Sequence, residues 1–213
     1  MKYYLFDFDG TLVDSMPDFG AMMLRILDEN SIVYAPDILK VITPLGYVGT
    51  ARYYREKFGM TLSEEALLEL MHTYAAEAYH KRIPAKSNVA EVLNKLRMSG
   101  ASLNELTASP HDMLDPCLER LGIYELFDNV WSCEDFGTTK SDPEIYKRAA
   151  EIIGAPVSEI LFLDDNLNAD LTAKAAGMPV CGVFDASSSE YEAEMRAACD
   201  YYIKDFAELI NIH

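Results

Sequence analysis

The opening of the chain constrains its fold more than any other stretch. Tyr3–Phe6 is an apolar run, and Asp7, Asp9 and Gly10 follow it at once. A short continuous apolar run is typical of a strand buried on both faces of a parallel sheet. Open α/β sheets place their chemistry at the carboxyl ends of such strands. The sequence therefore predicts a buried first strand that delivers two carboxylates to its tip.

Helical and strand patterns alternate from residue 85 onward, which is typical of a parallel α/β sheet with right-handed crossovers. Further strands are expected at Ala101–Leu106, Asn129–Cys133, Ile160–Leu163, Pro179–Phe184 and Tyr201–Ile203. Helices are expected at Val89–Met98, Pro110–Leu121, Pro143–Ile153, Tyr191–Ala198 and Asp205–Ile210. One more helix is expected after Asp165, and it ends at Ala176. Residues 1–14 and 85–213 thus form an α/β core with about five strands.

Residues 15–84 carry no strand pattern and predict an all-helical insert. Helices are expected at Met16–Glu29, Pro36–Val41, Ala51–Phe58 and Ser63–His80, with a turn at Thr43–Gly46. Apolar residues recur at helical spacing in the first and last of these segments. The insert would be joined to the core by two flexible connections.

Composition excludes several classes of partner. Half of the 213 residues are apolar, which allows a sizeable core. Lys and Arg number 18 against 35 Asp and Glu, and the net charge of −17 argues against nucleic acid or an anionic membrane as a partner. The four cysteines lack metal-site spacing and predict free thiols in the cytoplasm. We expect neither a signal peptide nor a membrane span.

One strand contains a local conflict. Asn104 and Glu105 precede Thr107 in a segment that should be a buried parallel strand. Either this strand starts late and is short, or the two polar side chains have partners that the sequence does not reveal.

Reactive side chains follow several of the expected strands, and parallel strands bring them to one edge of the sheet. Asp7 and Asp9 follow the first strand, and Asp164 and Asp165 follow another. Clustered carboxylates raise one another's pKa unless a cation lies among them, and Mg²⁺ is the natural choice for oxygen ligands. A phosphate group could complete its coordination. Lys140, the Thr107 hydroxyl and the backbone N–H of Ala108 are suitable phosphate donors.

This chemistry suggests a role for each acid of the first turn. A carboxylate is a competent nucleophile toward phosphorus when a metal ion holds both groups, which we assign to Asp7. The leaving group needs a proton and the attacking water must lose one, which Asp9 can do in both half-reactions.

The chain resembles the haloacid dehalogenase superfamily. Its four motifs occur in order: D-F-D-G-T-L-V-D-S, L-T-A-S, Lys140 before Ser-Asp-Pro, and F-L-D-D-N with Asp170. The helical insert resembles the type-1 cap of phosphoglycolate-phosphatase-like and β-phosphoglucomutase-like members. The resemblance implies a three-layer Rossmann-like core, a cap at residues 15–84, and phosphoryl transfer, because dehalogenase members lack the second aspartate that is present here as Asp9.

The resemblance also implies residue roles. Asp7 would be nucleophile and Mg²⁺ ligand, and Asp9 would be acid/base and ligand through its carbonyl. Thr107 and Lys140 would bind phosphate. The family's fourth motif uses either adjacent acids or a later aspartate, so Asp165 would be the main ligand, supported by Asp164 or, as a fallback, by Asp170.

The segment from Gly46 to Arg52 is a candidate for substrate selection. The glycine-containing turn leads into a helix, and the insert carries 7 basic against 9 acidic residues, whereas the core carries 11 against 26. Arg52 could meet an anionic substrate tail; the simpler alternative is a surface arginine paired with Glu56.

The sequence therefore predicts a cytoplasmic, Mg²⁺-dependent phosphatase of a small phosphorylated metabolite that acts through an aspartyl-phosphate. A sugar-phosphate mutase with the same chemistry is the first alternative. A non-catalytic binding protein on the same fold is the second. The substrate and the oligomeric state are not determined by the sequence.

Overall fold

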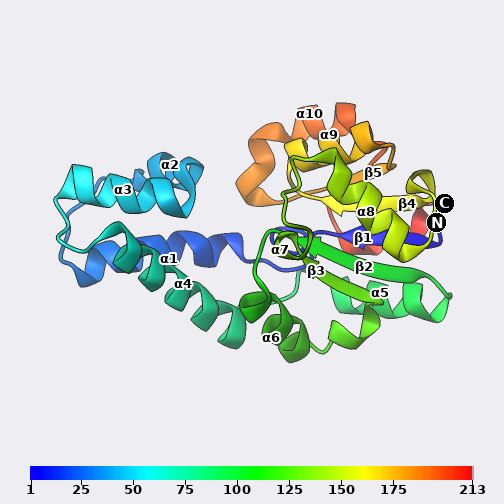
Figure 1. Cartoon of the computed structure of the whole chain (residues 1–213), viewed down its shortest axis with the longest axis horizontal. Helices are drawn as coiled ribbons and strands as arrows, with labels where there is room; N and C mark the ends of the chain where they lie inside the picture. The colour runs from blue at the N-terminus through cyan, green and yellow to red at the C-terminus, as the bar shows by residue number, and fades with distance from the viewer. Residues whose placement is uncertain (213) are drawn as a thin grey trace. The chain divides into compact units, whose positions relative to one another are not determined.

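The computed structural model describes residues 1–212, and these divide into two compact units. One unit comprises Met1–Asp14 and Ile83–His213, and the other comprises Ser15–Arg82. Figure 1 shows the first unit as a sheet with helices and the second as helices alone. No helix among residues 1–212 is both long and apolar enough to cross a membrane.

A six-stranded parallel sheet forms the centre of the first unit. Its strands are β1 (Tyr3–Phe6), β2 (Ser102–Thr107), β3 (Asn129–Ser132), β4 (Ile160–Asp164), β5 (Val180–Val183) and β6 (Tyr201–Ile203). The spatial order is β3-β2-β1-β4-β5-β6, and every neighbouring pair is parallel. The predicted α/β class is confirmed. Each of the six segments expected as strands forms one, Tyr201–Ile203 included, so the approximate count of five was one too low.

Helices cover both faces of this sheet, as Figure 1 shows. They are α5 (Val89–Met98), α6 (His111–Leu121), α7 (Cys133–Phe136), α8 (Pro143–Ile153), α9 (Leu167–Ala176) and α10 (Glu192–Ala198). On one face, Leu5 and Phe162 belong to a buried cluster with Tyr146 of α8 and Ala173 of α9. On the other face, the ring of Phe6 contacts Phe127 and Phe206. The sheet is therefore the middle of three layers.

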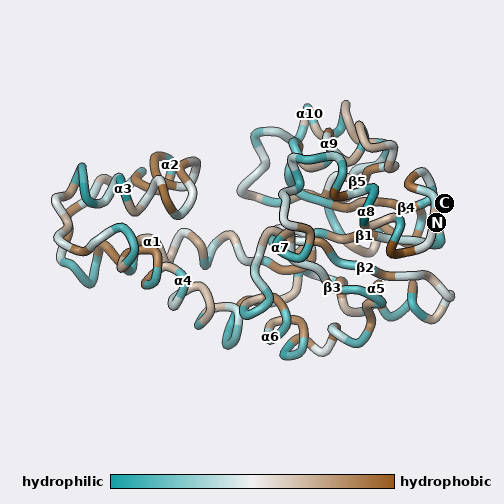
Figure 2. The backbone as a smooth tube through the Cα atoms, in the orientation of Figure 1, coloured by the Kyte–Doolittle hydropathy of each residue, from teal (hydrophilic) through white to brown (hydrophobic). Residues whose placement is uncertain are grey.

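Local signals set the bounds of several of these elements. Asp142 caps α8 through Glu144 N, Pro143 occupies its first turn, and Gly154 ends it in the left-handed conformation. Short 3-10 helices connect other elements: η2 (Tyr124–Leu126), η3 (Val157–Glu159), η4 (Ala186–Tyr191) and η5 (Phe206–Asn211). The last of these was expected as an α-helix, and the one-turn helix α7 was not expected. The tube in Figure 2 is brown along much of β1 and β4, as strands enclosed by two helical layers require.

The second unit consists of helices joined by loops, with no strand among its described residues. It contains α1 (Met16–Glu29), α2 (Ile38–Ile42), η1 (Thr43–Leu45), α3 (Gly46–Phe58) and α4 (Glu64–Lys81). Ser63 caps α4 by accepting a hydrogen bond from Ala66 N. The expected turn at Gly46 is wrong: α3 already begins there, and the buried hydroxyl of Thr50 stabilises this earlier start by donating to Ile42 O at 3.0 Å.

The two polar residues of the buried strand β2 have different environments. The strand does not start late, because Asn104 and Glu105 both lie inside it and both are fully buried. Asn104 is satisfied: its Nδ2 donates to Tyr4 O at 3.1 Å, and its Oδ1 accepts from Asn129 Nδ2 at 2.7 Å. Glu105 is different, since among residues 1–212 neither of its carboxyl oxygens has a hydrogen-bond partner of normal geometry. Among the described residues, the buried polar side chain of Asn104 is therefore satisfied, whereas that of Glu105 is not.

Candidate active site

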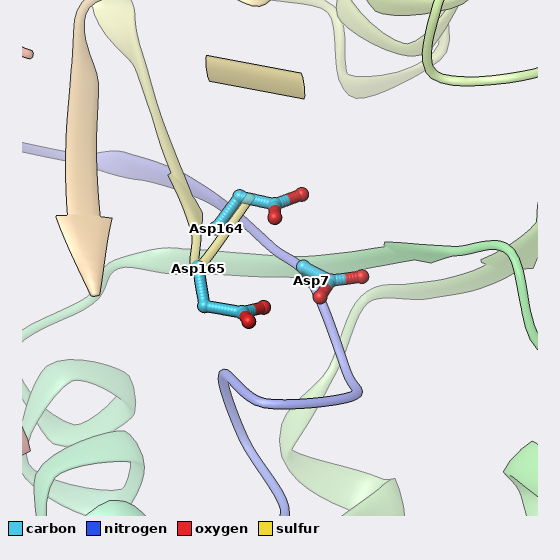
Figure 3. Close-up of side chains that lie close together, drawn as sticks. All are labelled: Asp7, Asp164 and Asp165. Atoms are coloured by element: carbon cyan, nitrogen blue, oxygen red, sulfur yellow. The ribbon is translucent and has the colours of Figure 1, made fainter. Parts of the chain in front are cut away.

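Three carboxylates meet at the carboxyl edge of the sheet. Asp7 directly follows β1, Asp164 is the last residue of β4, and Asp165 is the next residue. Because Phe6 lies opposite Leu163 in the β1–β4 register, the two strands end at the same level. One oxygen of each carboxylate lies within 4.8 Å of the others. Figure 3 shows these three side chains, one from the end of β1 and two from the end of β4.

Lys140 supplies positive charge to this cluster. Its Nζ donates to Asp7 Oδ1 and, at 2.8 Å, to Asp164 Oδ2. Tyr146 holds the backbone of this lysine, because its hydroxyl contacts Lys140 O at 3.1 Å and Ala169 O at 3.2 Å. Nothing in the sequence singles out this tyrosine beyond its helical spacing. The structure thus brings Lys140 together with Asp7 and Asp164.

One lysine does not balance the cluster. Burial, followed by the nearby charge of Asp164, raises the pKa of Asp7 to about 8. Burial, then Asp164 and Asp7, also raise the pKa of Asp165 well above its usual range. Burial opposes the charge on Lys140, but Asp164 and Asp7 outweigh it and raise the lysine's pKa. The site would ionise fully at neutral pH only with additional positive charge.

The donor set fits a hard divalent cation. Three convergent carboxylates offer oxygen ligands only, which suits Mg²⁺ better than a softer metal ion. The raised pKa values of Asp7 and Asp165 have the same implication, because a bound cation would favour the ionised form of both groups. Asp7, Asp164 and Asp165 could therefore hold the metal ion.

Asp9 has a different environment from Asp7. Its Oδ2 accepts a hydrogen bond from the Ser109 hydroxyl at 2.5 Å. The backbone N–H of Ser109 in turn donates to Thr107 Oγ1 at 3.1 Å. Thr107 is buried at the end of β2, and the next residue, Ala108, is exposed. Ser109 is the last residue of the L-T-A-S motif, and the sequence assigned it no role of its own. In the structure it is a hydrogen-bond partner of Asp9.

Asp170 lies apart from the three-carboxylate cluster. It is in the first turn of α9, and its Oδ2 accepts a hydrogen bond from Cys199 Sγ at 3.1 Å. Its carboxyl is buried, and burial followed by the charge of Asp164 raises its pKa. Of the two alternatives for the extra acid, Asp164 is the one whose oxygen lies near Asp7 and Asp165.

The two candidate selectivity residues lie in the helical unit. Gly46 is the first residue of α3, with a φ of 63°. Arg52 projects from the same helix, is 58% exposed, and its Nε lies 3.7 Å from Glu64 Oε1 of α4. Its acidic neighbour thus comes from the adjacent helix, whereas the simpler sequence interpretation paired Arg52 with Glu56.

Residues 1–177 match the family of haloacid dehalogenase-like hydrolases. The chain belongs to this family. Among curated relatives, it is 27% identical over 215 residues to the pyrophosphatase PpaX of Bacillus velezensis, covering 98% of this chain and 94% of the relative. It is 29% identical over 219 residues to the phosphoglycolate phosphatase of Mannheimia succiniciproducens, covering 97% and 96% of the two chains. The resemblance found in the sequence is confirmed.

Solved structures support the same fold. A protein from Haemophilus somnus, described as a predicted phosphoglycolate phosphatase, superposes with a TM-score of 0.83 at 23% identity, covering 99% of this chain and 97% of that one. A protein from Thermotoga maritima, described as a candidate β-phosphoglucomutase, gives 0.86 at 22% identity with the same coverage. At these identities the likeness establishes the fold.

Proposed function

We propose that this hydrolase is a Mg²⁺-dependent phosphatase, similar to phosphoglycolate phosphatases, that cleaves a small phosphorylated metabolite through an aspartyl-phosphate on Asp7. The observation that carries the proposal is the cluster of Asp7, Asp164 and Asp165, in which Asp7 and Asp164 accept hydrogen bonds from Lys140. The phosphatase names among its curated relatives support the same reaction class. Mg²⁺ held by Asp7, Asp164, Asp165 and the Asp9 carbonyl would neutralise phosphate charge and favour the ionised nucleophile.

Asp7 is the nucleophile of the proposed reaction. An Asp7 carboxylate oxygen forms a bond to phosphorus while the bond from phosphorus to the ester oxygen breaks. Asp7 is 4% exposed, so bulk water has little access to its carboxylate. Lys140 keeps one oxygen of this carboxylate oriented by a direct hydrogen bond. By orienting the attacking carboxylate, this lysine lowers the entropic part of the activation barrier.

Asp9 transfers the protons. In the first half-reaction its carboxyl donates a proton to the departing ester oxygen, and in the second it accepts one from the water that attacks phosphorus. The Ser109 hydroxyl, 2.5 Å from Asp9 Oδ2, keeps that side chain in one orientation. Asp7 and Asp9 can take different roles because their carboxyl groups have different partners.

Neutral donors at the end of β2 complete phosphate binding. Thr107 Oγ1 accepts the N–H of Ser109, so its own hydroxyl hydrogen is available to a phosphate oxygen. The backbone N–H of Ala108 is proposed as a second donor, and Lys140 as the charged one. We propose the helical unit as a substrate-selecting cap. Arg52, six residues after Gly46 in α3, would be the residue that meets an anionic tail.

We propose that the substrate is a small phosphate ester. The net charge of −17 argues against nucleic acid or an anionic membrane as a binding partner. The four cysteines are unpaired, which is consistent with the cytoplasm as the location.

Replacement of the nucleophile tests the proposal. Asp7→Asn should leave the fold intact and reduce Mg²⁺-dependent hydrolysis of phosphate esters by roughly 10³-fold or more. Glu151→Gln is the control, because it makes the same carboxylate-to-amide change at an exposed position of α8 away from the cluster. Substantial hydrolysis by folded Asp7→Asn would refute the assignment.

A panel of phosphate esters separates the remaining alternatives. Release of inorganic phosphate from a ranked set of small esters supports the phosphatase. Conversion of a hexose phosphate to its isomer would instead support a sugar-phosphate mutase, the activity suggested for the Thermotoga maritima protein. No turnover of any ester with Mg²⁺ would support a non-catalytic binding protein.

A further inference from the structure

Lys86 joins the chain segments on either side of the helical unit. Lys86 N donates to Leu12 O at 2.9 Å, and Asp14 N donates to Pro84 O at 3.0 Å. An antiparallel bridge between Val13 and Ala85 lies between these two bonds. The backbone of Lys86 is therefore fixed beside the end of the first motif.

The Lys86 side chain turns inward and uses all of its donors. Its Nζ donates to Gly10 O at 2.5 Å, to Phe184 O at 2.6 Å and to Asp185 Oδ2 at 3.1 Å. The side chain is only 19% exposed. An ammonium group has three N–H donors, so these contacts satisfy it completely. One lysine thus ties the turn after β1 to the end of β5.

The carboxylate of Asp185, which binds Lys86, is held in place by other hydrogen bonds. Its side chain is 5% exposed, and its Oδ1 accepts the backbone N–H of Ser187 at 2.9 Å and the Ser187 hydroxyl at 2.6 Å. Burial opposes ionisation of Asp185, but the Ser187 hydrogen bonds and Lys86 outweigh it and lower the pKa. A buried ion pair in which both carboxylate oxygens also have well-placed donors is the kind that holds a fixed geometry.

The carbonyl held by Lys86 belongs to the residue that packs on a proposed metal ligand. Gly10 has a φ of 74°, and a Cβ on it would lie 2.5 to 2.7 Å from the carboxyl atoms of Asp165. The Gly10 backbone is therefore in close contact with the Asp165 carboxylate. Movement of Gly10 would change the space in which that carboxylate is oriented.

We propose that Lys86, held by Asp185, is a positioning residue for the metal site: it fixes Gly10 against Asp165 and so sets the orientation of that carboxylate toward a divalent cation. This inference rests on the proposed function in taking Asp165 as a metal ligand. Neither Lys86 nor Asp185 belongs to the motifs of the sequence, and neither touches the reacting atoms.

Metal binding by the unloaded protein is the direct test. Lys86→Met keeps most of the apolar stem and removes the three hydrogen bonds. We expect Mg²⁺ affinity, measured by calorimetry, and Mn²⁺ affinity, measured by electron paramagnetic resonance, to fall about tenfold. Hydrolysis should recover toward the wild-type kcat at saturating Mg²⁺, so that the half-saturating Mg²⁺ concentration carries most of the effect.

Lys174→Met is the matched control. Lys174 also donates to one carbonyl, Ala198 O at 2.6 Å, and to one carboxylate, Asp200 Oδ1 at 3.0 Å, within the same unit. It should change metal affinity by less than about twofold. Folded Lys86→Met that binds Mg²⁺ as tightly as wild type would overturn the inference, and so would an equal loss in Lys174→Met.

A second variant decides the outcome if Lys86→Met does not fold. Asp185→Asn keeps the lysine and its bond to Gly10 but weakens its anchor, so metal affinity should fall about threefold; an unchanged affinity overturns the inference. The proposed function fails separately, if wild type binds Mg²⁺ but hydrolyses no phosphate ester. Wild type that binds neither cation would refute both the metal assignment and the role of Lys86.

Discussion

Replacement of Glu105 by methionine should stabilise the protein. Glu105 is fully buried in β2, in register with Phe6 on one side and Val130 on the other. The Trp131 N–H lies close enough to lower its pKa slightly, yet within residues 1–212 neither carboxyl oxygen has a normal hydrogen bond. Burial, followed by the charge of Asp7, raises the pKa of Glu105 well above its ordinary value.

The sign of the pH effect follows from this shift. Because the pKa is higher in the folded state, the folded protein retains a proton that the unfolded chain releases above roughly pH 4.3. Glu105 therefore costs stability that grows with pH, by up to about 1.4 kcal/mol per pH unit, until pH reaches the folded-state pKa. Below the unfolded pKa this part of the cost vanishes.

The magnitude has a second, pH-independent part. A buried polar group without partners costs about 1–3 kcal/mol even when it is neutral. Methionine has a similar length and no such group, so Glu105→Met should gain roughly 1–3 kcal/mol at or below about pH 4.3. The pH-dependent part adds to this gain at pH 5.5 and adds more at pH 7.5. For a chain of this size each kcal/mol corresponds to about 2–4 °C in melting temperature.

Urea and thermal unfolding at pH 5.5, 6.5 and 7.5, in chelator and without Mg²⁺, measure this difference. Glu105→Gln should show the pH-dependent gain with little of the constant part, because it removes the charge and keeps the polarity. Glu151→Gln, at an exposed position of α8, should show neither. A Glu105→Met protein that is less stable than wild type, or a gain that is equal at all three pH values, would refute the reasoning.

Two further substitutions test the site and the helical unit. Gly10→Ala should weaken Mg²⁺ binding at least about tenfold, because the added Cβ would overlap the Asp165 carboxyl. Gly122→Ala is the control: Gly122 has a φ of 70°, but a Cβ added there would have no atom within 4 Å. This variant should lose only the backbone cost of about 1–2 kcal/mol in stability. Arg52→Ala should raise KM for an anionic ester about tenfold, whereas Arg55→Ala, which shares the partner Glu64, should not; equal effects would argue against the role of Arg52.

The sequence by itself determined the sheet and the residues at its edge. Apolar runs such as Ile160–Leu163 are typical of inner strands, and acids directly after two such runs lie at one edge when the strands are parallel. Ser63, Asp142 and Gly154 likewise set helix ends through bonds to near neighbours. Local hydrogen bonding and periodicity act over a few residues, so a pattern in the sequence contains them.

Tertiary structure decided which groups share an environment. The sequence presented Asp7 and Asp9 as one acidic turn, but Asp7 meets Asp164 and Lys140, whereas Asp9 meets Ser109. It also left Asp164 and Asp170 as alternatives, and only the packing of α9 turns Asp170 toward Cys199.

Some roles that the sequence pattern did not predict depend on contacts between residues far apart in the sequence. Lys86 contacts Gly10 and Asp185, which are 76 and 99 positions away. The sequence left open whether the strand begins after Glu105 or whether Glu105 has unseen partners. Only the folded sheet shows that it is buried beside the charge of Asp7. Such contacts depend on the final arrangement of strands and loops, so the sequence supplies the groups, and the fold determines which of them meet.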